Sequence, residues 1–117
     1  MAAPNIVNVS TITGKTAGLA VTTTATNIVS NDSDTGKVFK INALYVANID
    51  GTNAAGITVN LIKGRTPYSI ASTITVPADS TIEVINKAIY LEEGSSISLL
   101  ASADSDLHAV CSYEEIS

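Results

Sequence analysis

Apolar and polar residues alternate with a period of two along most of this 117-residue chain, and turn residues interrupt the alternation about every eight to twelve residues. Apolar residues at helical spacing are hard to find. The pattern predicts an all-β fold, a single antiparallel β-sandwich of jelly-roll or immunoglobulin-like type with roughly seven to nine short strands. We expect one domain over residues 1–117, in which residues 1–12 are either a first strand or an extended N-terminal arm.

The clearest predicted strand is the run VFKINALYVAN, which starts at Val38. Strict alternation places Phe39, Ile41 and Tyr45 on one face of this strand. It places Leu44 and Val46 on the opposite face, so the strand is apolar on both sides and must be central or covered by a partner. Before it we expect two weaker strands, IVNVSTI and AVTTTATNIVS, around Gly14 and Gly18.

Composition limits the functions that are open to the chain. Hydrophobic residues make up 45% and aromatic residues only 4%, without Trp, so the predicted core is aliphatic and no cofactor pocket lined by rings is expected. The net charge is −5, and the six Lys and Arg residues are spread singly. This argues against a nucleic-acid partner. No apolar run is long enough for a membrane helix, and the start MAAPNIVNVS does not resemble a secretory signal, so we expect neither a membrane partner nor export.

The stretch from Tyr90 to Cys111 holds the only histidine and the only cysteine of the chain. In an extended strand His108 and Cys111 point to opposite faces, so they cannot form a nucleophile pair. We therefore expect Cys111 in the core and no catalytic residues. The motif Glu92-Glu93-Gly94 is interpreted as a solvated turn in preference to a pair of glycosidase carboxylates.

Acidic residues occur at two places where a metal site has to be weighed. Asp104 and Asp106 share a face with His108 in an extended segment, and Asp32 and Asp34 lie in NDSDTG. The second motif lacks the full spacing and the closing glutamate of a calcium loop. We expect solvated turns and no metal site at both places. Weak ion binding is left open, and a small calcium- or carbohydrate-binding module is the remote alternative.

The chain has more apolar surface than a small sandwich can bury, in the segments NALYVA, AIYL and ISLL. Part of this surface should lie at a subunit interface, where tyrosine is favoured. The candidate tyrosines are Tyr45, Tyr68, Tyr90 and Tyr113. The predicted interface residues are Leu44, Tyr45, Val46, Tyr90 and Leu100.

Four segments resemble small virion structural proteins of tailed bacteriophages, cyanophages in particular: PNIVNVSTITGKT, KVFKINALYVANIDGTNAAGITVNL, ASTITVPADSTIEVINKAIYLEEGSSISLLASA and VCSYEEI. The resemblance covers nearly the whole chain and contains no catalytic motif. It implies a non-enzymatic capsid decoration subunit, made in the host cytoplasm and placed on the outer surface of the particle, with a neck or tail subunit as the alternative. The implied partners are further copies of the chain, as a trimer, and the major capsid protein or other virion proteins.

Overall fold

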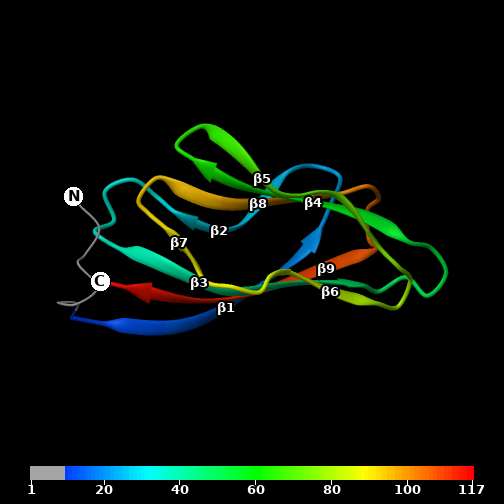
Figure 1. Cartoon of the computed structure of the whole chain (residues 1–117), viewed down its shortest axis with the longest axis horizontal. Helices are drawn as coiled ribbons and strands as arrows, with labels where there is room; N and C mark the ends of the chain where they lie inside the picture. The colour runs from blue at the N-terminus through cyan, green and yellow to red at the C-terminus, as the bar shows by residue number, and fades with distance from the viewer. Residues whose placement is uncertain (1–9) are drawn as a thin grey trace.

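The computed structural model describes residues 10–117, which form two antiparallel sheets packed face to face (Figure 1). Sheet A consists, in spatial order, of β1 (Ile12–Val21), β9 (Leu107–Ile116), β3 (Val38–Asn48) and β6 (Thr81–Ile85), with β7 (Ile89–Leu91) also paired to β3. Sheet B consists, in spatial order, of β2 (Thr26–Asn31), β8 (Ser95–Ala101), β4 (Ala55–Lys63) and β5 (Thr66–Val76).

The order of the connections distinguishes the two predicted sandwich types. Apart from the β4–β5 and β6–β7 connections, each successive strand lies in the other sheet. An immunoglobulin domain instead keeps its first two strands paired in one sheet, whereas interleaved sheets of this kind form a jelly roll. The predicted antiparallel β-sandwich is confirmed. Residues 10–117 contain no helix that is long and apolar enough to cross a membrane.

The core between the sheets is built almost entirely from aliphatic side chains. Its largest fully buried members come from both sheets: Ile41, Leu44, Ile57, Leu91, Ile97, Leu99 and Leu107. Their burial follows the alternation of the strands and supplies the main stabilising free energy, at roughly 25 cal/mol per Å² of apolar surface. Phe39 and Tyr113 form an aromatic pair within this layer, with ring centroids 5.6 Å apart.

The first strand runs through both glycines that were expected to interrupt it. β1 pairs with β9 without a register shift from Ile12 to Val21, and Gly14 and Gly18 lie inside this ladder. The predicted division at these glycines is therefore wrong, and the chain turns after Val21 instead. Residues 1–9, which include most of the predicted IVNVSTI strand and of the possible arm 1–12, lie outside the described residues. Ser10 and Thr11 donate backbone hydrogen bonds to the carbonyl oxygen of Ser117.

A β-bulge in β3 overturns the predicted faces of that strand. The pairing of β3 with β9 shifts by one residue between Ile41 and Ala43, and an extra residue reverses the alternation beyond it. Ile41 therefore points into the core before the bulge, and Leu44 and Val46 point into it afterwards, all three fully buried. The prediction that Leu44 and Val46 face away from the core and meet a partner is wrong.

Two buried asparagines hold loops at opposite ends of the sandwich. The side-chain amide of Asn48 donates to the carbonyls of Asn53 and Val76, and its oxygen accepts from the Asp50 N–H. Asn31 likewise donates to the carbonyls of Lys37 and Leu91. Because each amide satisfies backbone groups of different segments, it fixes a loop against the core without leaving a buried polar group unpaired.

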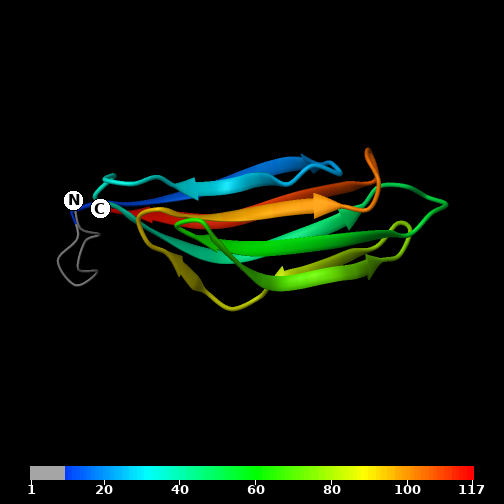
Figure 2. The same ribbon diagram turned by 90° about the horizontal axis from the view of Figure 1, so that it is seen from above.

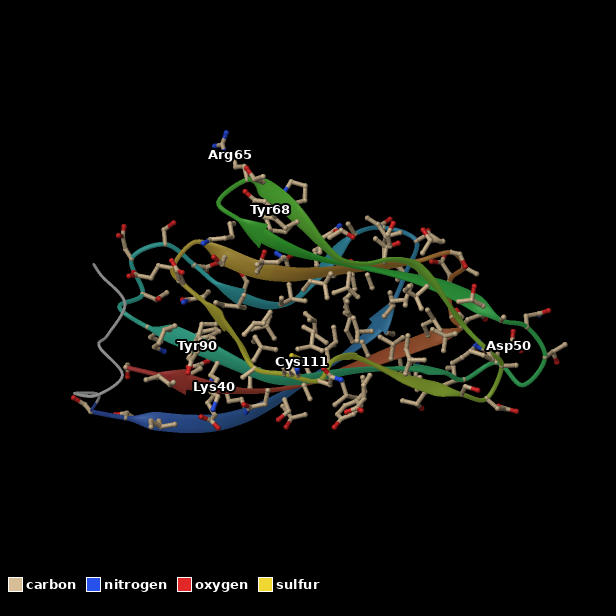
Figure 3. All side chains as sticks on the ribbon, viewed as in Figure 1. Lys40, Asp50, Arg65, Tyr68, Tyr90 and Cys111 are labelled. Carbon is tan, nitrogen blue, oxygen red and sulfur yellow. The ribbon has the colours of Figure 1, made fainter. Side chains whose placement is uncertain are left out.

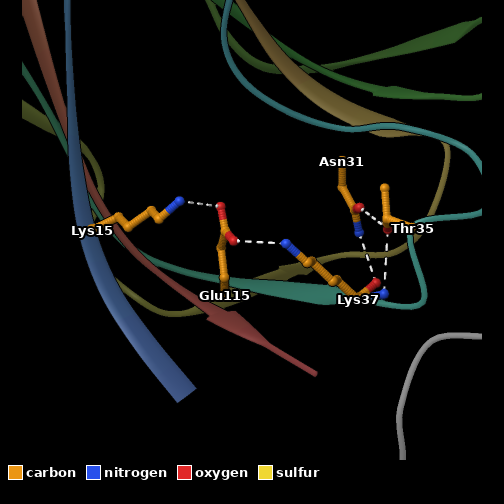
Figure 4. A network of polar contacts seen from close by, with 5 residues as sticks. All are labelled: Lys15, Asn31, Thr35, Lys37 and Glu115. Atoms are coloured by element: carbon orange, nitrogen blue, oxygen red, sulfur yellow. Dashed lines mark hydrogen bonds and ion pairs between the residues drawn. The ribbon is translucent and has the colours of Figure 1, made fainter. Parts of the chain in front are cut away.

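A small ionic network closes the end of the sandwich near the C-terminus (Figure 4). The Glu115 carboxylate lies 2.9 Å from Lys15 Nζ and 3.2 Å from Lys37 Nζ, so it links β1, β9 and the segment before β3. The hydrogen bond from Lys15 lowers the pKa of Glu115, and Lys37 lowers it further. The same hydrogen bond raises the pKa of Lys15. The carboxylate is therefore stabilised in its charged form.

Candidate functional site

The outer face of sheet A carries an exposed apolar pair at its centre. Tyr45 on β3 lies directly opposite Val110 on β9. Their strand neighbours Leu44, Val46 and Cys111 are buried, so the pair points to solvent, and Tyr45 is 39% and Val110 44% exposed. Directly opposite side chains in a sheet contact each other, so these two form one continuous apolar surface.

Small residues lie beside this pair on the sheet face. Ala43 and Ala47 flank Tyr45 on β3, and Gly18 of β1 lies opposite Val110. A Cβ atom built on Gly18 would meet nothing within 4 Å. Beside Val110 this produces a shallow hollow of about 230 Å³, lined by Gly18, Leu19, Ala20, His108, Ala109 and Val110.

Polar residues form the border of the same face. Glu83 of β6 lies opposite Tyr45, and Glu114 of β9 accepts a hydrogen bond from the Asn42 amide at 3.3 Å. Tyr90 lies opposite Lys40, and Figure 3 shows these two side chains near one end of the sandwich. An apolar centre with a polar border is the usual composition of a protein interface.

The structure separates the predicted interface residues into three groups. Tyr45 and Tyr90 lie on the outer face of sheet A and are exposed, and Leu100 is half-buried on β8 of sheet B. Leu44 and Val46 belong to the core. Whether the exposed members contact a partner stays a prediction.

The other two candidate tyrosines, Tyr68 and Tyr113, do not lie on the outer face of sheet A. Tyr113 packs against Phe39 inside the sandwich, and Tyr68 is 55% exposed on β5, in the hairpin that projects from sheet B in Figure 3.

Val110 was absent from the predicted interface although its position was visible in the sequence. The alternation in DLHAVCSY places it with His108 and Ser112, away from the core. An apolar residue between two polar residues on the same strand face is the signal that identifies it.

His108 and Cys111 lie on opposite faces of β9, as predicted. His108 is exposed, whereas Cys111 is fully buried, and Figure 3 shows Cys111 between the two sheets. Burial raises the pKa of the Cys111 thiol to about 11. The thiol is therefore protonated at neutral pH. His108, on the opposite face of the strand, is not placed to act as its base.

The acidic motifs form turns and caps. Asp104 accepts a hydrogen bond from the backbone N–H of Thr23, and Asp32 accepts one from the Ser30 hydroxyl. Within residues 10–117 no three His, Cys, Asp or Glu side chains are grouped so that they could hold a metal ion.

Asp50 and the Glu92-Glu93-Gly94 motif likewise belong to a loop and a turn. Asp50 caps the loop after β3, and hydrogen bonds from the Thr52 and Asn53 N–H groups lower its pKa. Glu92-Glu93-Gly94 is a turn as predicted, with Gly94 at a φ of 79°, a conformation that glycine adopts at little cost.

Two further hollows lie at the sides of the sandwich. An apolar one of about 250 Å³ opens where the β4–β5 hairpin diverges from β6 and β7, and Leu61, Ile70, Val84 and Ile89 contribute to its wall. A polar one of about 310 Å³ is lined mainly by Asn, Ser and Gly residues of β2, β8 and the adjacent turns, together with Asp32 and with Ile62 of β4. No aromatic side chain lines the polar hollow, so it lacks the stacking surface that a carbohydrate site usually offers.

Comparisons with known proteins give a fold and no family. No family model and no curated protein matches the chain. Among solved structures, the chain is similar to a protein of Bacillus endospore appendages, which form a novel family of disulfide-linked pili, with a TM-score of 0.54 and 17% identity over 92% of this chain and 88% of that one. The nucleoplasmin-like N-terminal domain of Drosophila FKBP39 gives a TM-score of 0.49 and 14% identity, with 89% of each chain covered. The first similarity shows a shared fold.

Proposed function

We propose that the chain is a non-enzymatic structural subunit of a tailed-phage particle, a capsid decoration subunit that binds the outer surface of the head through the outer face of sheet A. The observation that carries this proposal is the exposed Tyr45–Val110 pair at the centre of this face, with small residues beside it. Contiguous exposed apolar surface with a polar border is typical of protein interaction sites. The sequence resemblance to virion proteins supplies the kind of assembly.

Two further features support a structural role on the outside of a particle. The one cysteine is buried and protonated, and the one histidine lies on the other face of its strand, so the usual nucleophile and base are not brought together. The net charge of −5 would be repelled by packaged DNA and is compatible with the outer surface. The partner that this role requires is the major capsid protein, together with further copies of the chain.

Quantitative mass spectrometry of purified particles tests the proposal. The particles come from the phage that encodes the chain, and the copy number of the chain is measured relative to the major capsid protein. A ratio close to a simple fraction of the capsid protein supports decoration of the head. A much smaller copy number would assign the chain to the neck or tail. Absence from purified particles would overturn the virion role.

A further inference from the structure

We propose that the free edge of β1 is a self-association surface, where a second copy of the chain adds its own β1 antiparallel and continues sheet A across a two-fold axis. Among residues 10–117, β1 is the last strand on its side of sheet A, and Figure 2 shows it along one long side of the molecule. This inference concerns a different surface from the outer face of sheet A. It therefore does not depend on binding to a particle.

The hydrogen-bond pattern identifies which residues of β1 have unpaired backbone groups. Thr11 and Ser117 exchange both backbone hydrogen bonds, each at 2.9 Å. In an antiparallel ladder such pairs recur at every second residue, so the odd-numbered residues of β1 bond to β9. The N–H and C=O groups of the even-numbered residues point away from the sheet. These residues are Ile12, Gly14, Thr16, Gly18 and Ala20.

The same residues leave this edge open to another strand. Ala20 is small and the two glycines have no side chain, and a Cβ atom at Gly14 or Gly18 would meet nothing within 4 Å. The register with β9 is unbroken over the whole of β1, so the edge is straight and regular. Lys15 is its only charged residue, and the Lys15 ammonium is held by Glu115.

The other sheet edges carry features that discourage strand addition. β2 has six residues and a register shift between Asn27 and Val29. β5 contains Pro67, two register shifts and a left-handed residue, Thr73. The edge formed by β6 and β7 is interrupted at residues 86–88. Natural proteins protect their edges with such bulges, prolines and breaks, and β1 has none of them.

The residues of β1 allow it to pair with β1 of a second copy. An even-numbered residue must face an even-numbered residue of the second copy, because only these residues have backbone N–H and C=O groups that do not bond to β9. A two-fold axis through Thr16 pairs all five, with Gly14 opposite Gly18 and the exposed Ile12 opposite Ala20. Lys15 then faces Ala17, so the two ammonium groups do not oppose each other. Main-chain pairing of this kind is a common mode of strand addition.

The contact is expected to be weak in dilute solution. A single pair of ten-residue strands buries less surface than the roughly 1,200 to 2,000 Å² of a stable interface. Association should therefore increase with concentration. On a surface that gathers many copies, the effective concentration is high and the same contact becomes significant.

Sedimentation velocity and directed crosslinking test the inference on the purified chain without particles. The wild type should shift from monomer to dimer with increasing concentration. Thr16→Cys should form a disulfide-linked dimer under mild oxidation, because residues facing each other on the axis have Cα atoms about 5.5 Å apart, within the range of a disulfide. Ala20→Cys is the matched control, exposed on the same edge but facing Ile12, and should crosslink much less.

Three results would overturn the inference. The first is a wild type that stays monomeric up to its solubility limit, and the second is a trimer. The third is equal crosslinking of Thr16→Cys and Ala20→Cys, which indicates random collision. The sedimentation of the wild type decides the matter even if a variant fails to fold. If the wild type binds particles but stays monomeric in solution, this inference is overturned and the proposed function is not.

Discussion

Tyr45 and Val110 lie directly opposite each other on neighbouring strands, and both side chains point to solvent from the centre of sheet A. The exposure of Tyr45 results from the bulge between Ile41 and Ala43, which turns Leu44 and Val46 inward and Tyr45 outward, whereas Val110 is exposed by the regular alternation of β9. The core and the candidate interface therefore come from adjacent residues of one strand. Substitutions in β3 should consequently separate effects on folding from effects on binding.

Leu44→Ala should destabilise the chain strongly. Leu44 is fully buried between the sheets, and truncation of such a leucine lowers the free energy of unfolding by about 2 to 5 kcal/mol. Leu100→Ala removes the same atoms from a half-buried site and should cost clearly less. Urea unfolding of both variants measures the difference. Equal costs would contradict the assignment of Leu44 to the core.

Asn48→Ala should also destabilise the chain, through lost hydrogen bonds. The substitution leaves the carbonyls of Asn53 and Val76 without their amide donor, and an unsatisfied buried group costs roughly 1 to 3 kcal/mol. Asn27→Ala, at an exposed position of β2, is the control and should be nearly neutral. Thermal unfolding compares the two. A neutral Asn48→Ala would mean that water replaces the amide.

Glu115→Gln should lower stability at neutral pH and have little effect in acid. The pKa of Glu115 is lowered in the folded chain, first by the hydrogen bond from Lys15. A lowered pKa contributes stability that is complete above the unfolded value and is lost as the pH falls through the folded value. The difference between wild type and Glu115→Gln should therefore shrink below the ordinary glutamate pKa of 4.5.

Urea unfolding across this pH range measures that difference. Glu92→Gln, which removes an exposed carboxylate 3.7 Å from Lys63, should show little effect at any pH. A difference for Glu115→Gln that does not change with pH would show that the ion pairs contribute nothing to stability.

Cys111 should resist thiol reagents in the folded chain. It is fully buried, and burial raises its pKa to about 11, so the thiolate is scarce and inaccessible at neutral pH. Addition of denaturant should expose it and give one equivalent of reaction per chain. Rapid labelling without denaturant would indicate an open or reactive site at β9, and would revive a catalytic role for this strand.

The alternation in the sequence predicted the sandwich and most strands from Val38 onward, because strands with one buried face are marked by their own side chains. It failed at β1, where Gly14 and Gly18 have low strand propensity and the pairing with β9 decides the structure. It failed again at the faces of β3, because an alternation rule cannot detect a bulge of one residue. Tyr45 was assigned to the interface, and Val110 was missed although the alternation in DLHAVCSY already placed it away from the core; the pairing then showed that it lies beside Tyr45.

The most direct test of the proposed docking face is cosedimentation of the purified chain with phage heads that lack it. Wild type should bind, and Tyr45→Ser and Val110→Asp should each reduce the affinity at least about tenfold, since truncation of a central interface residue commonly costs more than 1 kcal/mol. Tyr68→Ser is the matched control on the projecting hairpin and should bind like wild type. Two results would contradict the proposed docking face. One is that folded Tyr45→Ser and Val110→Asp bind heads as tightly as wild type, and the other is that the wild type does not bind heads.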